Sequence, residues 1–245
     1  YTSGSWAISG AHRRPSIAGR FRFTDFDFAN QIKSRLVDGT INTSLAKRTI
    51  DNLKLQITSL NLGNQLIDSV RLVLEDQAFN IDIQADSHRF AIIEGKIDKI
   101  YTGRVDRVSG SLDGFEFRNL KPIEYDIEHK SISEMEFVVG QGRLLVQLTA
   151  GRRYFRLEKM RLDDLNKFLR RPKMYGVATV TLSGEEFRVE CDSFKLLEIV
   201  NYGELDIHGR LMGKQLMIDS LWLIDLDGAQ AWASGTLRLD GIDIK

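Results

Sequence analysis

The chain has 245 residues, and its 34 Lys and Arg residues balance 34 Asp and Glu residues, so its formal net charge is zero. A nucleic-acid-binding protein normally carries a basic excess, and this class is therefore disfavoured. The single Cys excludes an intramolecular disulfide and a four-thiolate metal site. No uncharged apolar run reaches about 18 residues, so the sequence predicts no transmembrane helix.

The chain starts without Met and shows no signal-peptide pattern. We expect residues 1–20 to be an irregular start. The last residues, 241–245, fall inside an alternating pattern, and we therefore expect the chain to be a segment of a longer protein.

Residues 24–37 break the alternation that dominates the rest of the chain. They place Phe28, Ile32 and Leu36 four positions apart, and Gly39 follows as a C-terminal signal. This spacing predicts a short amphipathic helix lying across an opening or an end of the sheet.

Period-two alternation is clearest in residues 79–86, where odd positions are apolar and even positions are polar. Successive side chains of a strand point to opposite faces, so this pattern predicts a strand with one apolar and one solvated face. Similar runs occur at residues 53–57, 70–74, 115–117, 144–148, 205–208 and 237–240. Half-polar strands favour antiparallel pairing, because buried parallel strands would be continuously apolar.

A second short helix is predicted at residues 163–171. Leu165, Phe168 and Leu169 have helical spacing, an Asp can cap the start, and Pro172 ends it. The order of strand, short helix, strands and a Gly-x-Gln-Leu hairpin occurs twice along the chain, which predicts a first β unit at 21–154 and a second at 155–245, each with one short helix.

No group of residues indicates catalysis or metal binding. His12, His88, His129 and His208 are far apart in sequence, and none has a second ligand at metal-binding spacing. Cys191 shares the apolar parity of its strand, which predicts a small buried hydrophobe. We therefore expect a protein that is not an enzyme and needs no cofactor.

The strands and helices together resemble a known family. The resemblance covers roughly residues 21–244 and is carried by Gly-x-Leu-x-Leu-x-Gly turns, by the motif Leu-Asp-Asp-Leu at residues 162–165 followed by the alternating run 172–184, and by the closing run 233–241. In these motifs the chain resembles the AsmA-like superfamily, and most closely the TamB (translocation and assembly module) proteins.

The resemblance implies a fold, a place and a role. It implies an all-β fold with a long curved sheet, the β-taco, whose concave face is an apolar groove. It implies part of an inner-membrane-anchored protein that crosses the periplasm, with the anchor outside this segment. The implied role is phospholipid transport towards the outer membrane and support of outer-membrane protein assembly with a barrel partner of the TamA type.

Acyl chains need a dry apolar trough without specific hydrogen bonds, and one-faced strands side by side can provide one. The candidate lining residues are Leu53, Leu55, Ile57, Val70, Leu72, Leu74, Phe79, Ile81, Ile83, Leu205, Ile207, Leu237 and Leu239. Ordinary core packing is the alternative for each of them. A closed β-sandwich, a β-solenoid adhesion or scaffold module, and an enzyme on a β-helix are the competing interpretations. Exposed sheet edges also predict self-association.

Overall fold

The computed structural model describes residues 2–10, 15–28, 32–44, 49–62, 65–99, 101–149, 152–166, 173–196, 200–213 and 215–238. The chain forms two compact units, Tyr1–Lys130 and Ser131–Lys245, which we call unit 1 and unit 2.

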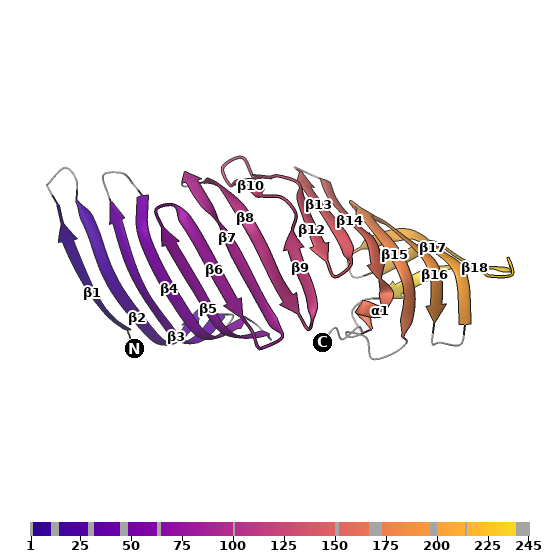
Figure 1. Ribbon diagram of the computed structural model, residues 1–245, viewed down its shortest axis with the longest axis horizontal. Coiled ribbons are helices and arrows are strands. Elements are labelled where there is room, and N and C mark those ends of the chain that lie inside the picture. Colours follow the sequence, from indigo (N-terminus) through magenta and orange to yellow (C-terminus); the bar gives the residue numbers. More distant parts are fainter. Residues whose placement is uncertain are drawn as a thin grey trace. The chain divides into compact units, whose positions relative to one another are not determined.

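Unit 1 is an antiparallel meander whose strands lie side by side in chain order (Figure 1). Its strands are β1 (Thr2–Ser9), β2 (Ser16–Phe28), β3 (Ile32–Ser44), β4 (Thr49–Leu62), β5 (Gln65–Glu75), β6 (Ala78–Gln84), β7 (Arg89–Lys99), β8 (Thr102–Leu112), β9 (Phe115–Asn119) and β10 (Ile123–Asp126). Strands β9 and β10 pair with successive parts of β8. Residues 1–20, for which we expected irregular structure, thus contain β1 and the start of β2.

Unit 2 is also an antiparallel meander, and its described residues include one short helix. Its elements are β11 (Ser131–Ile132), β12 (Met135–Val139), β13 (Gly142–Thr149), β14 (Arg152–Arg161), α1 (Leu162–Leu165), β15 (Met174–Ser183), β16 (Glu186–Leu196), β17 (Val200–Met212), β18 (Gln215–Asp225) and β19 (Gln230–Arg238).

Both sheets are open. The extensive contacts of each described strand are those with its hydrogen-bonded neighbours, and only α1 adds a second layer, on β14 and β15. The predicted open antiparallel all-β fold is therefore confirmed, and the alternative of a closed β-sandwich is not formed within either unit. Neither sheet is curled, so the curved shape expected from the resemblance is not seen.

The helix predicted at residues 24–37 is wrong, because this segment forms parts of β2 and β3. Asp25 has a positive φ of 53°, and the β2–β3 register skips it, since Thr24 pairs with Leu36 and Phe26 with Ser34. The register is unchanged on either side of Asp25, so this is a local interruption of the strand by a non-glycine residue with positive φ, which is uncommon in a strand. The Phe23 and Phe26 rings lie 6.1 Å apart. The residues that suggested a helix belong to two paired strands: Phe28 ends β2, and Ile32 and Leu36 lie four apart in β3, a spacing that also keeps side chains of a strand on one face.

The same irregularity continues into the neighbouring strand β4. Ser59 has a φ of 54°, and the register of β3 with β4 skips it. Ser34 is only 4% exposed and pairs with Leu60, the residue after Ser59. Its hydroxyl oxygen lies 3.0 Å from the Thr58 carbonyl oxygen and 3.1 Å from that of Leu36. The buried hydroxyl thus contacts carbonyl oxygens next to the skipped position.

The second predicted helix is present in part. Helix α1 covers Leu162–Leu165, whereas Phe168 and Leu169 lie outside the described residues. The N-cap is Arg161, which makes no side-chain capping bond, so the predicted capping by Asp is wrong. Asp163 instead accepts a hydrogen bond from Arg161 Nε at 3.0 Å.

Candidate functional site: an uncovered apolar sheet face

Nine candidate lining residues belong to unit 1, and the strand register brings them together on one face. They form three cross-strand rows over β4, β5 and β6, which are Leu53–Leu74–Phe79, Leu55–Leu72–Ile81 and Ile57–Val70–Ile83. We call these the Leu53, Leu55 and Ile57 rows. The alternation in each strand produces this arrangement, since every second side chain points to the same face.

Each row continues into the neighbouring strands without a polar residue. The Leu55 row runs Phe21–Gly39–Leu55–Leu72–Ile81–Ile93–Val108. The Ile57 row runs Phe23–Val37–Ile57–Val70–Ile83–Ala91–Gly110–Phe117. With strands about 4.8 Å apart, the Leu55 row spans roughly 29 Å across β2–β8. The rows cross the strands, so any apolar track on this face runs perpendicular to them.

The Leu53 row extends furthest, from β1 to β8 and β10. It runs Trp6–Gly19–Ile41–Leu53–Leu74–Phe79–Gly95–Val105–Ile123. Three apolar rows side by side therefore form one continuous face over unit 1, which we call the apolar face.

Aromatic residues on the apolar face are paired with glycines. In each pair the two residues lie directly opposite on neighbouring strands, and the ring occupies the space of the missing Cβ. The pairs are Trp6–Gly19, Phe21–Gly39, Phe79–Gly95, Phe117–Gly110 and Tyr125–Gly103, with Phe187–Gly209 in unit 2. Large side chains are thus accommodated against the sheet, as in the pairing of edge glycines with aromatic residues.

The apolar face of unit 1 is not covered by another layer of the described chain. Eight of the nine residues in the central rows are half-buried, and only Leu74 is buried, at 6% exposure. Their partial burial comes from neighbours on the same sheet. A sheet face of this kind, apolar and open, is the type of surface that binds a partner or an apolar ligand.

Unit 2 presents a related face that is partly covered. Leu205 and Ile207 lie in cross-strand rows with Cys191 and Val189, as the alternation predicts. Leu205 is buried in a core cluster with Leu162 of α1, and Ile207 packs against this cluster. α1 therefore covers part of the face that we predicted to line a groove.

The last two candidates are at the end of the chain. Leu237 pairs with Leu216 on β18 and is 48% exposed. Leu239 lies outside the described residues. The twelve candidates that the structure describes therefore comprise a continuous set of nine in unit 1, two residues next to α1, and one exposed residue near the end of β19.

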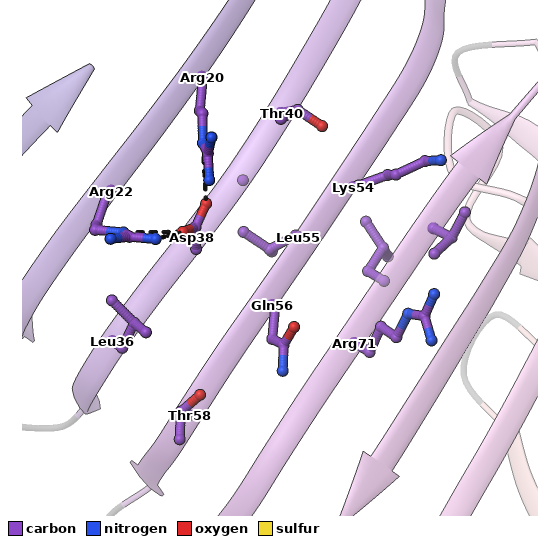
Figure 2. A pocket seen from close by; sticks show the side chains of 13 residues that line it. Arg20, Arg22, Leu36, Asp38, Thr40, Lys54, Leu55, Gln56, Thr58 and Arg71 are labelled. Carbon is purple, nitrogen blue, oxygen red and sulfur yellow. Dashed lines mark hydrogen bonds and ion pairs between the residues drawn. The ribbon is translucent and has the colours of Figure 1, made fainter. Parts of the chain in front are cut away.

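The opposite face of unit 1 carries the charges. Arg22 on β2 donates hydrogen bonds to Asp38 on β3, with Arg22 Nε 2.9 Å from Asp38 Oδ2 (Figure 2). Lys54 on β4 forms an ion pair with Glu75 on β5, with Lys54 Nζ 2.7 Å from Glu75 Oε1. We call this the polar face. The hydrogen bond from Lys54, together with its positive charge, holds the pKa of the Glu75 carboxyl below its usual value.

Cys191 is a buried core residue, as predicted, with 2% exposure. Burial raises the pKa of its thiol to about 11, and the nearby Asp192 charge adds to this shift. A thiol with this pKa is protonated at neutral pH and is a poor nucleophile. In the part of the chain that the structure describes, no group of three or more His, Cys, Asp or Glu residues is placed to hold a metal ion.

Sequence reasoning missed several members of the apolar face. Phe21 and Phe23 alternate with Arg22, which is a strand signal, but this run is short and was not included among the candidate lining residues. Ile41, Ile93 and Val105 stand in short or interrupted runs, and only the register shows that they extend the rows.

Comparisons with known proteins identify no relative: no family model matches the chain, and no curated protein or solved structure matches it. Among the described residues, no helix is both long enough and apolar enough to cross a membrane.

Proposed function

We propose that this chain is a lipid-conduit segment whose apolar face in unit 1 carries phospholipid acyl chains. The observation that carries the proposal is the set of three unbroken apolar rows on a sheet face that no other layer of the described residues covers. Each methylene removed from water on such a surface contributes about 0.8 kcal/mol, and no directed hydrogen bond is required. The direction of the rows suits movement across the strands.

The wider role rests on the family resemblance. In this proposal the chain belongs to an AsmA/TamB-like protein that is anchored in the inner membrane and spans the periplasm. It passes phospholipid towards the outer membrane and supports outer-membrane protein assembly with a barrel partner of the TamA type. The open sheet supports this proposal because it leaves an apolar surface free for lipid.

Gentle purification followed by mass spectrometry of bound lipid tests the proposal. We expect phospholipid to copurify with the wild-type chain. A lipid-free preparation, obtained under conditions in which the sheet is intact by circular dichroism, would contradict the proposal and favour a scaffold or adhesion module.

A matched pair of variants locates the lipid on one face. Ile81→Asp places a carboxylate in the Leu55 row and should greatly reduce the bound lipid, since burying a charge is costly. Gln56→Asp places the same group on the polar face, because Gln56 follows Leu55 in β4 and points the other way. We expect this control to retain wild-type lipid. Equal loss in both variants would argue against the assignment of the face.

A further inference from the structure

Unit 2 has an apolar face of its own, built from three cross-strand rows. The Met160 row runs Met160–Ala178–Cys191–Leu205–Leu223–Ala231. The Leu157 row runs Phe137–Leu144–Leu157–Val180–Val189–Ile207–Leu221–Ala233. The Phe155 row runs Met135–Val146–Phe155–Leu182–Phe187–Gly209–Ile218–Gly235. No charged residue interrupts these rows, so unit 2 repeats the pattern on which the lipid proposal for unit 1 rests.

Helix α1 covers only the first of these rows. It lies against β14 and β15 (Figure 1). Its Leu162 is 8% exposed and belongs to one buried cluster with Ala178, Cys191 and Leu205 of the Met160 row. In the Leu157 row, by contrast, the residues on β15 to β18 are only half-buried. An apolar side chain from outside the sheet thus occupies the Met160 row, and the Leu157 row beside it has no second layer among the described residues.

The described attachments of α1 are few. The N-cap residue Arg161 makes no side-chain capping hydrogen bond. At the other end, Asn166 Nδ2 donates to the Met174 carbonyl oxygen at 2.7 Å, and Asn166 Oδ1 accepts from the Met174 N–H at 2.8 Å. These two bonds tie α1 to β15, whereas each inner strand of unit 2 is held by backbone ladders on both sides. A segment attached in this way opens at a lower free energy than the strands beneath it.

We propose that α1 is a displaceable cover, and that Leu162 occupies a position on the unit 2 apolar face that an acyl chain takes when lipid binds there. This inference rests on the proposed lipid function and adds a regulatory contact to it. An acyl chain on the Met160 row would lie against the cluster that now encloses Leu162. The two exclude each other, so a lipid that binds only the uncovered form shifts the equilibrium towards that form.

The hydrogen bond from the Met174 N–H to Asn166 Oδ1 reports on the cover directly, since a hydrogen-bonded amide exchanges with solvent when its bond opens. Amide hydrogen exchange of the full chain is measured by NMR with and without diheptanoyl-phosphatidylcholine below its micellar concentration. We expect the lipid to speed up exchange at Met174 by about tenfold, because it selects the uncovered form.

Unit 1 supplies a matched reference for this measurement. The Val108 N–H donates to Asn119 Oδ1 at 2.7 Å, which is also a backbone-to-asparagine bond. Its exchange should not rise when lipid is added. Unchanged or slower exchange at Met174 in lipid-bound protein would mean that α1 is a permanent part of the core, and would overturn the proposal.

Asn166→Ala weakens the cover without touching the apolar face, because it removes both hydrogen bonds to Met174. A photoreactive amino acid at Leu223, which belongs to the Met160 row and packs against the cluster, detects lipid there. The variant should raise the yield of lipid adduct at this position by roughly twofold or more, since it raises the population of the uncovered form. A purely structural role of Asn166 predicts a lower yield instead.

Asn119→Ala is the matched control variant. It removes the hydrogen bonds of Asn119 to the Val108 N–H and to the carbonyl oxygens of Asp106 and Lys121, all in unit 1. The adduct yield at Leu223 should stay at its wild-type value. An equal gain in both variants would show a general loosening of the protein and would overturn the cover.

A photoreactive amino acid at Leu55, on the apolar face of unit 1, separates this proposal from the lipid function itself. A lipid adduct at Leu55, together with no response of α1 to lipid or to Asn166→Ala, would overturn the cover alone. Absence of adducts at both Leu55 and Leu223 in folded protein would overturn the lipid function and the cover together.

Discussion

Phe79 on β6 lies directly opposite Gly95 on β7, and its ring fills the space that a larger residue would need. A Cβ atom at position 95 would come within 2.7 Å of the ring and 2.2 Å of the Arg104 carbonyl oxygen. The Phe79 ring can therefore lie on the apolar face at this position only because residue 95 is glycine and has no Cβ atom.

Gly95→Ala should destabilise the protein by about 1–3 kcal/mol, because the ring and the neighbouring strand must move to admit the methyl group. Urea unfolding followed by circular dichroism measures the change.

Gly235→Ala is the control for the effect of glycine itself. No atom lies within 4 Å of the position where its Cβ would be. The substitution should be neutral or stabilise the protein by up to about 1 kcal/mol, since it restricts the unfolded chain. Similar destabilisation by both variants would show that the Phe79–Gly95 pairing does not limit residue size at position 95.

Cys191 should resist alkylation in the folded protein. Its side chain is 2% exposed, and burial raises the pKa of the thiol to about 11. At pH 8 the folded chain should react with iodoacetamide far more slowly than the urea-unfolded chain, as measured by mass spectrometry. Equal rates would mean that the core cluster around α1 opens readily.

Asp86 should titrate at unusually low pH. Its carboxylate accepts hydrogen bonds from Arg89 Nε at 2.6 Å and from the backbone N–H of His88 at 2.8 Å, which hold its pKa below the usual value of 3.8. A carboxyl with a lowered pKa stabilises the fold above its unfolded pKa, and this contribution is lost as the pH falls through its folded pKa.

Arg89→Gln should move the pKa of Asp86 upwards, because it removes the largest cause of the shift. Carboxyl ¹³C NMR titration measures this. Asp126, whose pKa is lowered chiefly by the backbone N–H of His129, serves as the internal reference and should not change. A shift of both residues would point to a general change in the fold.

Most of the fold could be predicted from alternation, and the failures concern local features. Runs such as residues 79–86 directly indicate strands with one apolar face, and their register follows from aligning these faces. The positive φ values at Asp25 and Ser59 could not be predicted, because non-glycine residues with positive φ have no clear sequence signal. The false helix has another origin: Phe28 ends β2 whereas Ile32 and Leu36 lie in β3, and a spacing of four residues fits an alternating strand as well as a helix.

The candidate site was predictable in part. The central rows consist of residues whose parity is plain in the sequence, whereas the aromatic–glycine pairs depend on which strands are neighbours. Whether an apolar face is covered depends on layers far apart in sequence. Alternation alone therefore could not distinguish Ile81, which is half-buried on an uncovered face, from Leu205, which is buried beside α1.

Site-specific photo-crosslinking tests the central claim most directly. A photoreactive amino acid is placed at Leu55, on the apolar face, or at Gln56, its neighbour on the polar face, and the protein is irradiated in cells that make phospholipid. We predict a phospholipid adduct from position 55 and none from position 56. Adducts of equal yield from both positions, or none from position 55 in correctly folded protein, would contradict the proposed lipid conduit.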